Sequence, residues 1–112
     1  VPGPVQAAGI AALADDEHVA RQRAIYHDRL ILGRAVFAKL GVDAPMPAGG
    51  FYLWIPAPDG DAWALTERLA REAGALISPG EFYGQAGAGY VRVAMVQPDN
   101  LLRLVAERVG VA

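Results

Sequence analysis

The first forty residues carry apolar positions at helical spacing. A Pro-Gly-Pro turn at residues 2–4 predicts a short helix from Val5 to about Ala14. The acidic run at residues 15–17 suits the positive end of a second, longer helix, which should stop at Gly41. The apolar side of that second helix comprises Val19, Tyr26, Leu30, Gly33, Phe37 and Leu40. Two consecutive helices are therefore expected at the start of the chain.

Residues 45–77 have the pattern of a strand, a helix and a second strand. Two prolines break the chain before Phe51–Ile55, a run that is aromatic, branched and apolar on both faces, as in a buried strand. Asp61 is a plausible cap for the following helix, and Gly74 suits its end. Ala75–Ile77 predicts a short strand. The apolar positions assigned to the helix are Trp63, Leu65, Leu69 and Ala73, and both tryptophans, Trp54 and Trp63, are assigned to the core.

The last third of the chain alternates as a strand does and then returns to helical spacing. One strand face consists of Val91, Val93 and Met95, and the other of Tyr90, Arg92 and Ala94. Pro98 fits the first turn of a terminal helix whose apolar positions are Leu101, Leu102, Val105 and Val109. The order helix, helix, strand, helix, strand, strand, helix predicts an α/β fold of the α+β kind. A sheet of three or four strands should pack against the helices.

Composition excludes several classes of protein. At 112 residues, with 54% hydrophobic and 20% charged residues, the chain has the balance of one folded domain. A net charge of −2 provides no basic surface for nucleic acid, and no apolar run is long enough to span a bilayer. Without cysteine there are no disulfides and no thiolate metal sites. We expect a cytoplasmic protein that binds neither nucleic acid nor membrane.

Arg92 is the candidate ligand-binding residue. It lies between an aromatic residue and an alanine on a strand whose other face is apolar, and its guanidinium could bind a carboxylate bidentately. The alternative is an ordinary ion pair, with Glu81 as a possible partner. Phe82 and Tyr83 either line a pocket above Arg92 or form an aromatic plug that holds their own loop against the rest of the protein.

Other candidate sites are weaker. The segment GQAGAG resembles a phosphate-binding loop, but such loops open a helix, whereas a strand follows here. His18 and His27 are nine residues apart on one helix, so they do not converge as metal ligands and are read as solvated. Neither histidine can be placed near the Ser78 loop as part of a catalytic triad. We therefore predict neither a metal site nor a catalytic residue in this chain.

Three segments in order, PAGGFYLWI, SPGEFYG and YVRVAM, resemble the C-terminal part of the class I/II aminotransferases. These are fold type I enzymes that depend on pyridoxal phosphate. The match runs through Pro79, Gly80, Phe82, Gly84, Gly89 and Arg92. It implies that Arg92 grips the α-carboxylate of an amino-acid substrate, with Phe82 and Tyr83 beside it. The opening VPGPVQAA and ADDEHVARQRAIYHDRL most resemble succinyldiaminopimelate transaminases of the lysine pathway.

The resemblance also implies a domain organisation. Residues 1–112 would be one domain, the C-terminal small domain of a larger homodimeric enzyme, with a helical linking segment at 1–41 and a sheet-and-helix core at 45–112. A chain that begins at Val1 without a methionine fits this expectation. The substrates would be an amino acid and a 2-oxo acid. The alternative is a freestanding, non-enzymatic α/β module that binds an amino-acid effector or mediates assembly.

Lys39 is the only lysine, and pyridoxal phosphate enzymes hold their cofactor on a lysine amine. Lys39 is expected on the polar side of the long helix near its end, where a cation complements the helix dipole. In the family the cofactor lysine lies upstream of the matched region. We therefore expect no cofactor-binding residue in this chain and no activity from it alone.

Overall fold

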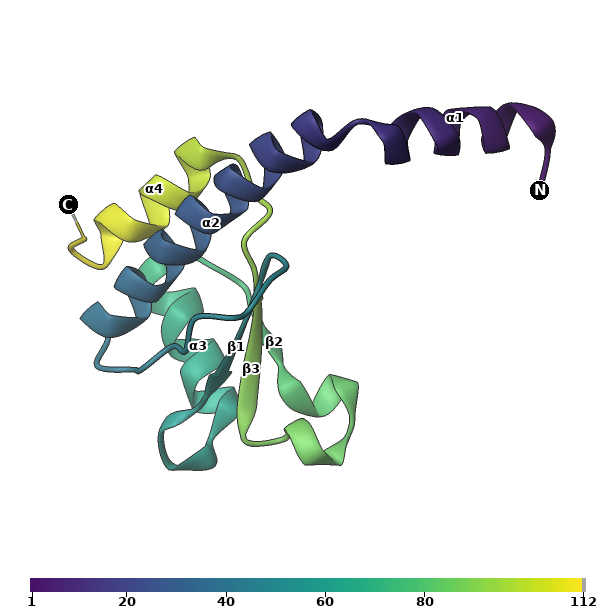
Figure 1. Cartoon of the computed structure of the whole chain (residues 1–112). Helices are drawn as coiled ribbons and strands as arrows, with labels where there is room; N and C mark the ends of the chain where they lie inside the picture. Colours follow the sequence, from purple (N-terminus) through teal and green to yellow (C-terminus); the bar gives the residue numbers. More distant parts are fainter. Residues whose placement is uncertain (112) are drawn as a thin grey trace.

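Two helices run end to end at the start of the chain, in the computed structural model that describes residues 1–111 (Figure 1). Helix α1 spans Gly3–Ala14 and α2 spans Asp16–Lys39, so both predicted helices are confirmed. Asp15 separates them and caps α2, because its carboxylate accepts hydrogen bonds from the backbone N–H groups of Glu17 and His18 at 3.0 and 3.2 Å. No residue of α1 is buried, and this helix projects away from the rest of the molecule.

The sheet is antiparallel and has three strands in the order β1-β3-β2. The strands are β1, Tyr52–Pro56; β2, Ser78–Pro79; and β3, Tyr90–Ala94. The central strand β3 pairs with β1 along its whole length and with β2 at two positions. The predicted fold class, a small sheet packed against helices, is confirmed.

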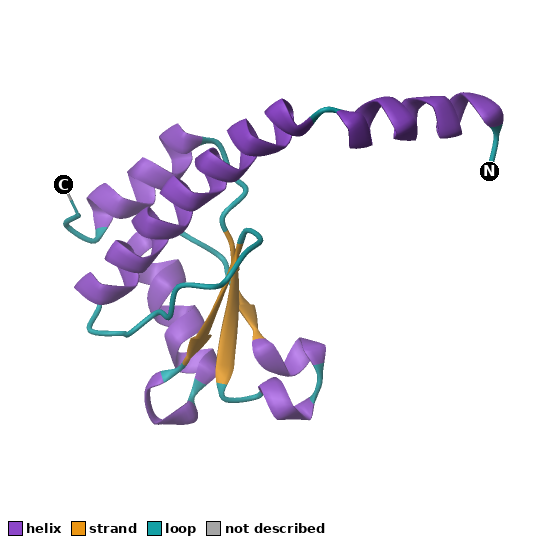
Figure 2. Ribbon diagram, viewed as in Figure 1, coloured by secondary structure: helices purple, strands orange, loops and turns teal. Residues whose placement is uncertain are grey.

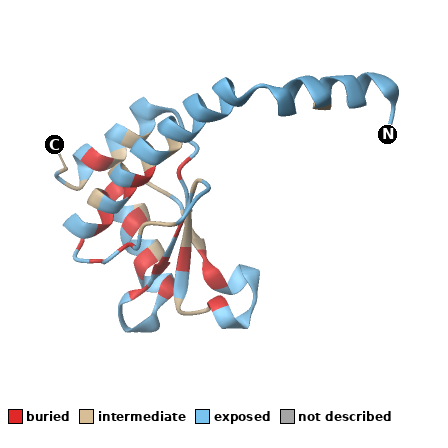
Figure 3. Ribbon diagram, viewed as in Figure 1, coloured by how far each residue is buried: buried red, intermediate tan, exposed pale blue. Residues whose placement is uncertain are grey.

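Helices α2, α3 (Ala62–Ala73) and α4 (Asp99–Arg108) all lie on one side of this sheet (Figure 2). The predicted alternation of β3 is confirmed, since Val91 and Met95 are buried under the helices. The second half of α2 belongs to this core, whereas its first half is exposed (Figure 3). The core between sheet and helices includes Leu30, Phe37, Leu53, Ile55, Leu65, Leu69, Val91 and Met95.

The ends of α3 and the start of α4 follow the sequence signals. Asp61 caps α3 by accepting a hydrogen bond from the backbone N–H of Ala64 at 3.0 Å. Gly74 ends the helix in the left-handed conformation, with φ of 68°, which glycine adopts without steric cost. Pro98 is the residue immediately before α4, and Arg29 pairs with Asp99 at 2.7 Å to join α2 to α4.

The predicted strand at Ala75–Ile77 is wrong. These residues form an irregular link from α3 to the sheet, and the chain first pairs with β3 at Ser78. Leu76 is 89% exposed, so its apolar side chain is not buried against the rest of residues 1–111. A run of three apolar residues fits a strand by composition alone, but a strand also needs a partner ladder, which local sequence does not reveal.

Both tryptophans were wrongly assigned to the core, since Trp54 is 40% and Trp63 49% exposed. In α3 the buried residues are Ala62, Leu65, Leu69 and Ala73, at steps of three and four. Trp63 lies two residues before Leu65, which places it on a different side of the helix. Trp54 belongs to the sheet face that the helices do not cover. Leu101, predicted on the apolar side of α4, is likewise 45% exposed.

Three short 3-10 turns complete the described fold: η1 at Pro58–Gly60, η2 at Gly80–Tyr83 and η3 at Gln85–Gly87. The last two form the connection between β2 and β3, which we call the 80–87 loop. In the described range, none of the helices is both long enough and apolar enough to cross a membrane.

Candidate functional site

The side of the sheet opposite the helices is lined with aromatic residues. Tyr52 and Trp54 from β1 point to this side, as do Tyr90 and Arg92 from β3, because alternate residues of a strand share a face. We call this surface the open face. Its three aromatic residues are 37–40% exposed, so the face is accessible within this chain. Arg92 therefore sits on the central strand, among aromatic neighbours.

The Arg92 guanidinium lies over two tyrosine rings. Its central carbon Cζ is 3.9 Å from the ring centre of Tyr83 and 4.5 Å from that of Tyr52. At such distances the electron-rich ring faces attract the cation. Among residues 1–111 no acidic side chain forms an ion pair with Arg92, and its side chain donates no hydrogen bond. Its N–H donors and its positive charge thus remain available to a ligand.

Trp54 supports the 80–87 loop. Its indole stacks on the Tyr90 ring at 5.3 Å with an interplanar angle of 12°, and it meets the edge of Tyr83 at 6.4 Å. Gly80 and Gly87 pass so close to the indole that a Cβ on either would lie 2.8 or 3.0 Å from Trp54 Cη2. The two glycines thus allow the loop to fold against the tryptophan.

The loop is also tied to α3. Trp63 Nε1 donates a hydrogen bond to Glu81 Oε1 at 2.6 Å, and the Phe82 ring meets the Trp63 ring edge-on at 5.8 Å. The possible pairing of Glu81 with Arg92 is therefore absent from this arrangement, because the carboxylate is bound to Trp63. Phe82 and Tyr83, considered together from the sequence, diverge: Tyr83 contacts Arg92, while Phe82 packs toward α3 and is 63% exposed.

Tyr52 is the site residue that the sequence analysis missed. The alternation of residues 51–55 places Tyr52 and Trp54 on one face. The missing information is the register, in which Tyr52 opposes Ala94 and Trp54 opposes Arg92, so that Tyr52 is the diagonal neighbour of the arginine. Such pairing joins segments about forty residues apart in sequence and has no local signal.

The residues present do not fit a cofactor held on lysine. Lys39 ends α2 and is exposed, and its Cε lies 3.4 Å from where a Cβ on Gly110 would be. His18 is bound through Nδ1 to Asp15 at 3.0 Å. Within residues 1–111 no three potential metal ligands gather. Within the described residues, the single lysine thus lies at the end of α2, and the cation without an acidic partner on the open face is Arg92.

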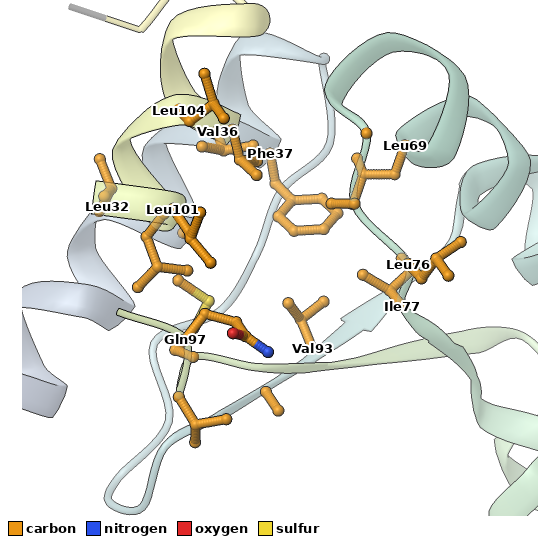
Figure 4. A pocket seen from close by; sticks show the side chains of 18 of the residues that line it. Leu32, Val36, Phe37, Leu69, Leu76, Ile77, Val93, Gln97, Leu101 and Leu104 are labelled. Carbon is orange, nitrogen blue, oxygen red and sulfur yellow. The ribbon is translucent and has the colours of Figure 1, made fainter. Parts of the chain in front are cut away.

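A hollow of about 530 Å³ lies on the helix side of the sheet (Figure 4). The labelled side chains come from α2, α4, the end of α3 and its link to the sheet, and β3 with the segment after it. Gln97 is the only polar one among those labelled. Ser78, Arg92 and Arg108 also line the hollow, and apart from Gln97 its other lining residues are apolar or glycine.

Comparison with known proteins connects the whole chain to one family. The family described as aminotransferase class I and II matches residues 1–109. A 4-dedimethylamino-4-oxo-anhydrotetracycline transaminase of Streptomyces rimosus is 42% identical over 108 residues, which cover 96% of this chain and 30% of that protein. An LL-diaminopimelate aminotransferase of Aquifex aeolicus is 37% identical over 109 residues, covering 96% and 28% respectively.

A solved structure shows the same similarity in three dimensions. An aminotransferase of Neisseria meningitidis superposes with a TM-score of 0.74 at 34% identity, covering 95% of this chain and 28% of that one. The chain thus spans less than a third of the relatives it matches.

Proposed function

This chain belongs to the class I and II aminotransferase family, and we propose that it is the C-terminal small domain of a complete aminotransferase. That enzyme would transfer an amino group between an amino acid and a 2-oxo acid. Residues 1–41 would link this domain to the remainder of the enzyme, with the second half of α2 packed into a core formed mainly by residues 45–112, of which 112 lies outside the described residues. We further propose that the complete enzyme is a homodimer, as the family resemblance implies.

The observation that carries the proposal is the environment of Arg92. An arginine on the open face, held over two neutral rings and without an acidic partner among residues 1–111, keeps its charge and donors for an external carboxylate. Every α-amino acid and 2-oxo acid carries such a carboxylate. Arg92 would bind and orient it, with Tyr83 against the guanidinium and Phe82 at the outer edge of the site.

Pyridoxal phosphate, on which this family generally depends, supplies the electron sink for amino transfer when it is bound. We propose that the lysine holding it lies in the part of the enzyme that precedes this chain, because Lys39 is exposed at the end of α2 beside Gly110. The contribution of residues 1–111 would be to orient the substrate. Orientation of a reactant can supply several kcal/mol of the activation barrier.

For the substrate, we propose an amino acid of the diaminopimelate type, such as the succinylated form used in the lysine pathway. The opening segment resembles succinyldiaminopimelate transaminases, and similarity to an LL-diaminopimelate aminotransferase supports the same substrate class. Arg92 itself would read only the α-carboxylate. Selection of the rest of the substrate would fall to residues outside this chain.

The test is Arg92→Lys in the complete enzyme. Lysine retains the charge but loses the planar fork of donors, so roughly 1–3 kcal/mol of charge-assisted hydrogen bonding is at risk. We expect kcat/KM to fall about tenfold to a hundredfold, with little change in Tm.

The matched control is Arg71→Lys, an exposed arginine whose pairing with Glu67 spans 3.8 Å, and it should leave kcat/KM unchanged. Unchanged kinetics in Arg92→Lys together with a large fall in Tm would make Arg92 a structural residue. Absence of any amino transfer by the wild-type enzyme would favour the freestanding binding module.

A further inference from the structure

We propose that Tyr52 and Tyr83 are positioning residues, which hold the Arg92 guanidinium in place to receive a substrate carboxylate. This inference rests on the proposed function of Arg92 and extends it to the residues that make the arginine a prepared binding site. Neither tyrosine needs to touch the substrate for this role. Each acts through its contact with the guanidinium.

The two tyrosines reach Arg92 from opposite neighbours of the central strand. Tyr52 belongs to β1 on one side of β3, and its ring centre is 4.5 Å from Arg92 Cζ. Tyr83 belongs to η2, which directly follows β2 on the other side of β3, and its ring centre is 3.9 Å away. An arginine side chain has several rotatable bonds, and contacts from both sides restrict the positions that its end group can take.

Neutral rings differ from an acidic partner in a way that matters for binding. A carboxylate beside Arg92 would occupy its N–H donors and cancel its charge, so a substrate would have to displace it. A tyrosine ring attracts the cation through its electron-rich face and leaves the charge intact. The arginine is thus held without being neutralised, and less of the substrate's binding energy is spent on ordering it.

Both tyrosines are themselves held by neighbouring rings. Tyr52 packs against Phe51 at 4.5 Å between ring centres, and Phe51 packs against Tyr26 of α2 at 5.1 Å. Tyr83 meets Trp54 at 6.4 Å. The 80–87 loop that carries Tyr83 is anchored by the hydrogen bond from Trp63 to Glu81. These supports connect the positions of the two rings to α2, β1 and α3.

The experiment compares Tyr83→Leu and Tyr52→Leu with Tyr83→Phe and Tyr52→Phe in the complete enzyme. The phenylalanine variants keep the ring face and lose only the hydroxyl, so they are the matched controls. Three quantities are measured: KM and kcat for the amino-acid substrate, and Kd for glutarate, a dicarboxylate that cannot react, by titration calorimetry. Tm is recorded for every variant.

We expect each leucine variant to raise KM and the glutarate Kd by about three- to thirtyfold, the range given by arginine–aromatic contacts. The value of kcat should change less, and the phenylalanine variants should stay within about twofold of wild type. If Tyr52→Leu lowers Tm strongly, the positioning role is judged from the Tyr83 variants, because Tyr83 lies on the loop and not in a strand. Tyr83→Gln is a second variant at that position, which removes the ring without adding apolar surface.

Two results separate this inference from the function on which it rests. Leucine variants that bind glutarate as tightly as wild type, in an enzyme that Arg92→Lys does impair, would overturn the positioning role alone. Glutarate binding by a wild-type protein that transfers no amino group would contradict the proposed function. In that case the calorimetric comparison of leucine with phenylalanine variants would still decide the role of the tyrosines.

Discussion

Trp54 and Arg92 face each other across the β1–β3 ladder, yet each makes its aromatic contacts with other residues. The indole stacks on Tyr90 at 5.3 Å, and the guanidinium lies diagonally over Tyr52 at 4.5 Å. Diagonal neighbours in antiparallel pairs are within reach of long and aromatic side chains. In this arrangement the Cη2 end of Trp54 contacts the 80–87 loop, while Arg92 contacts Tyr52 and Tyr83.

The first prediction concerns Lys39 and the isolated 112-residue chain. When this chain is incubated with pyridoxal phosphate and then reduced with borohydride, we expect no stoichiometric labelling and no transamination. The only lysine is exposed beside Gly110, at the end of a helix, and not inside a site that could enclose a cofactor. The control is Lys39→Arg, which should give the same background. Stoichiometric labelling of Lys39 with a shifted absorbance band would contradict the prediction.

The second prediction concerns the link between α3 and the loop. Trp63→Phe removes the N–H that donates to Glu81 while keeping an aromatic ring against Phe82. Since the bond is exposed, we expect a loss of about 1 kcal/mol or less, and about fivefold faster amide exchange in residues 80–87. Glu81→Gln keeps an oxygen acceptor and should have a smaller effect. Equal exchange rates in wild type and Trp63→Phe would mean that the loop is held by other contacts.

The third prediction uses the close packing of Gly80. In Gly80→Ala the new methyl would lie 2.8 Å from the Tyr90 carbonyl oxygen and 2.8 Å from Trp54 Cη2, and it would also meet the Gly87 carbonyl. Backbone atoms cannot yield as a flexible side chain does, so we expect the free energy of unfolding to fall by roughly 1–3 kcal/mol. Urea denaturation provides the measurement.

Gly49→Ala is the control for that substitution, because no neighbouring atom lies within 4 Å of the place that its methyl group would take. It should change the free energy of unfolding by no more than about 0.5 kcal/mol. A Gly80→Ala variant as stable as Gly49→Ala would show that the loop can shift away from Trp54 at little cost.

The fourth prediction concerns pH and the junction between α1 and α2. Hydrogen bonding from the backbone N–H of His18, with further help from the His18 side chain, lowers the pKa of Asp15. A carboxyl whose pKa is lower in the folded state stabilises that state above its unfolded pKa, and the stabilisation is lost as pH falls through the folded pKa. The first turn of α2 should therefore loosen in acid.

That loosening can be followed by NMR as amide exchange at Glu17 and His18 during an acid titration, together with the carboxyl resonance of Asp15. Asp15→Asn keeps an oxygen acceptor at the cap but cannot titrate. The loss of protection at these two amides in acid, measured relative to their intrinsic exchange rates, should therefore vanish while the cap persists. An Asp15 that titrates at the ordinary aspartate pKa would contradict the prediction.

Much of the fold could be predicted because its signals are local. The cap at Asp61, the left-handed glycine at Gly74 and the alternation around Val91 each depend on neighbours within a few residues. Arg92 stood out by the same means, as a charged residue on a strand with an apolar back. These features need no knowledge of what lies across the sheet.

The predictions that were wrong or missing concern residues whose surroundings are set by distant parts of the chain. Residues 51–55 are apolar on both faces, and only the placement of all three packed helices on one side decides that Leu53 is buried and Trp54 exposed. The contact of Tyr52 with Arg92 depends on the β1–β3 register, and the division of Phe82 from Tyr83 depends on how the 80–87 loop turns. Trp63 is different, because strict counting of helical steps would have separated it from Leu65.

Arg92 has a cross-strand partner on each side, Trp54 in β1 and Ser78 in β2. An arginine on an edge strand would depend on one ladder, and damage to that ladder would move it. Here the backbone of Arg92 is secured twice, so a substitution that frays either outer strand leaves the other ladder in place. A substitution in either outer strand, β1 or β2, should therefore leave Arg92 in place, because the other strand still pairs with it.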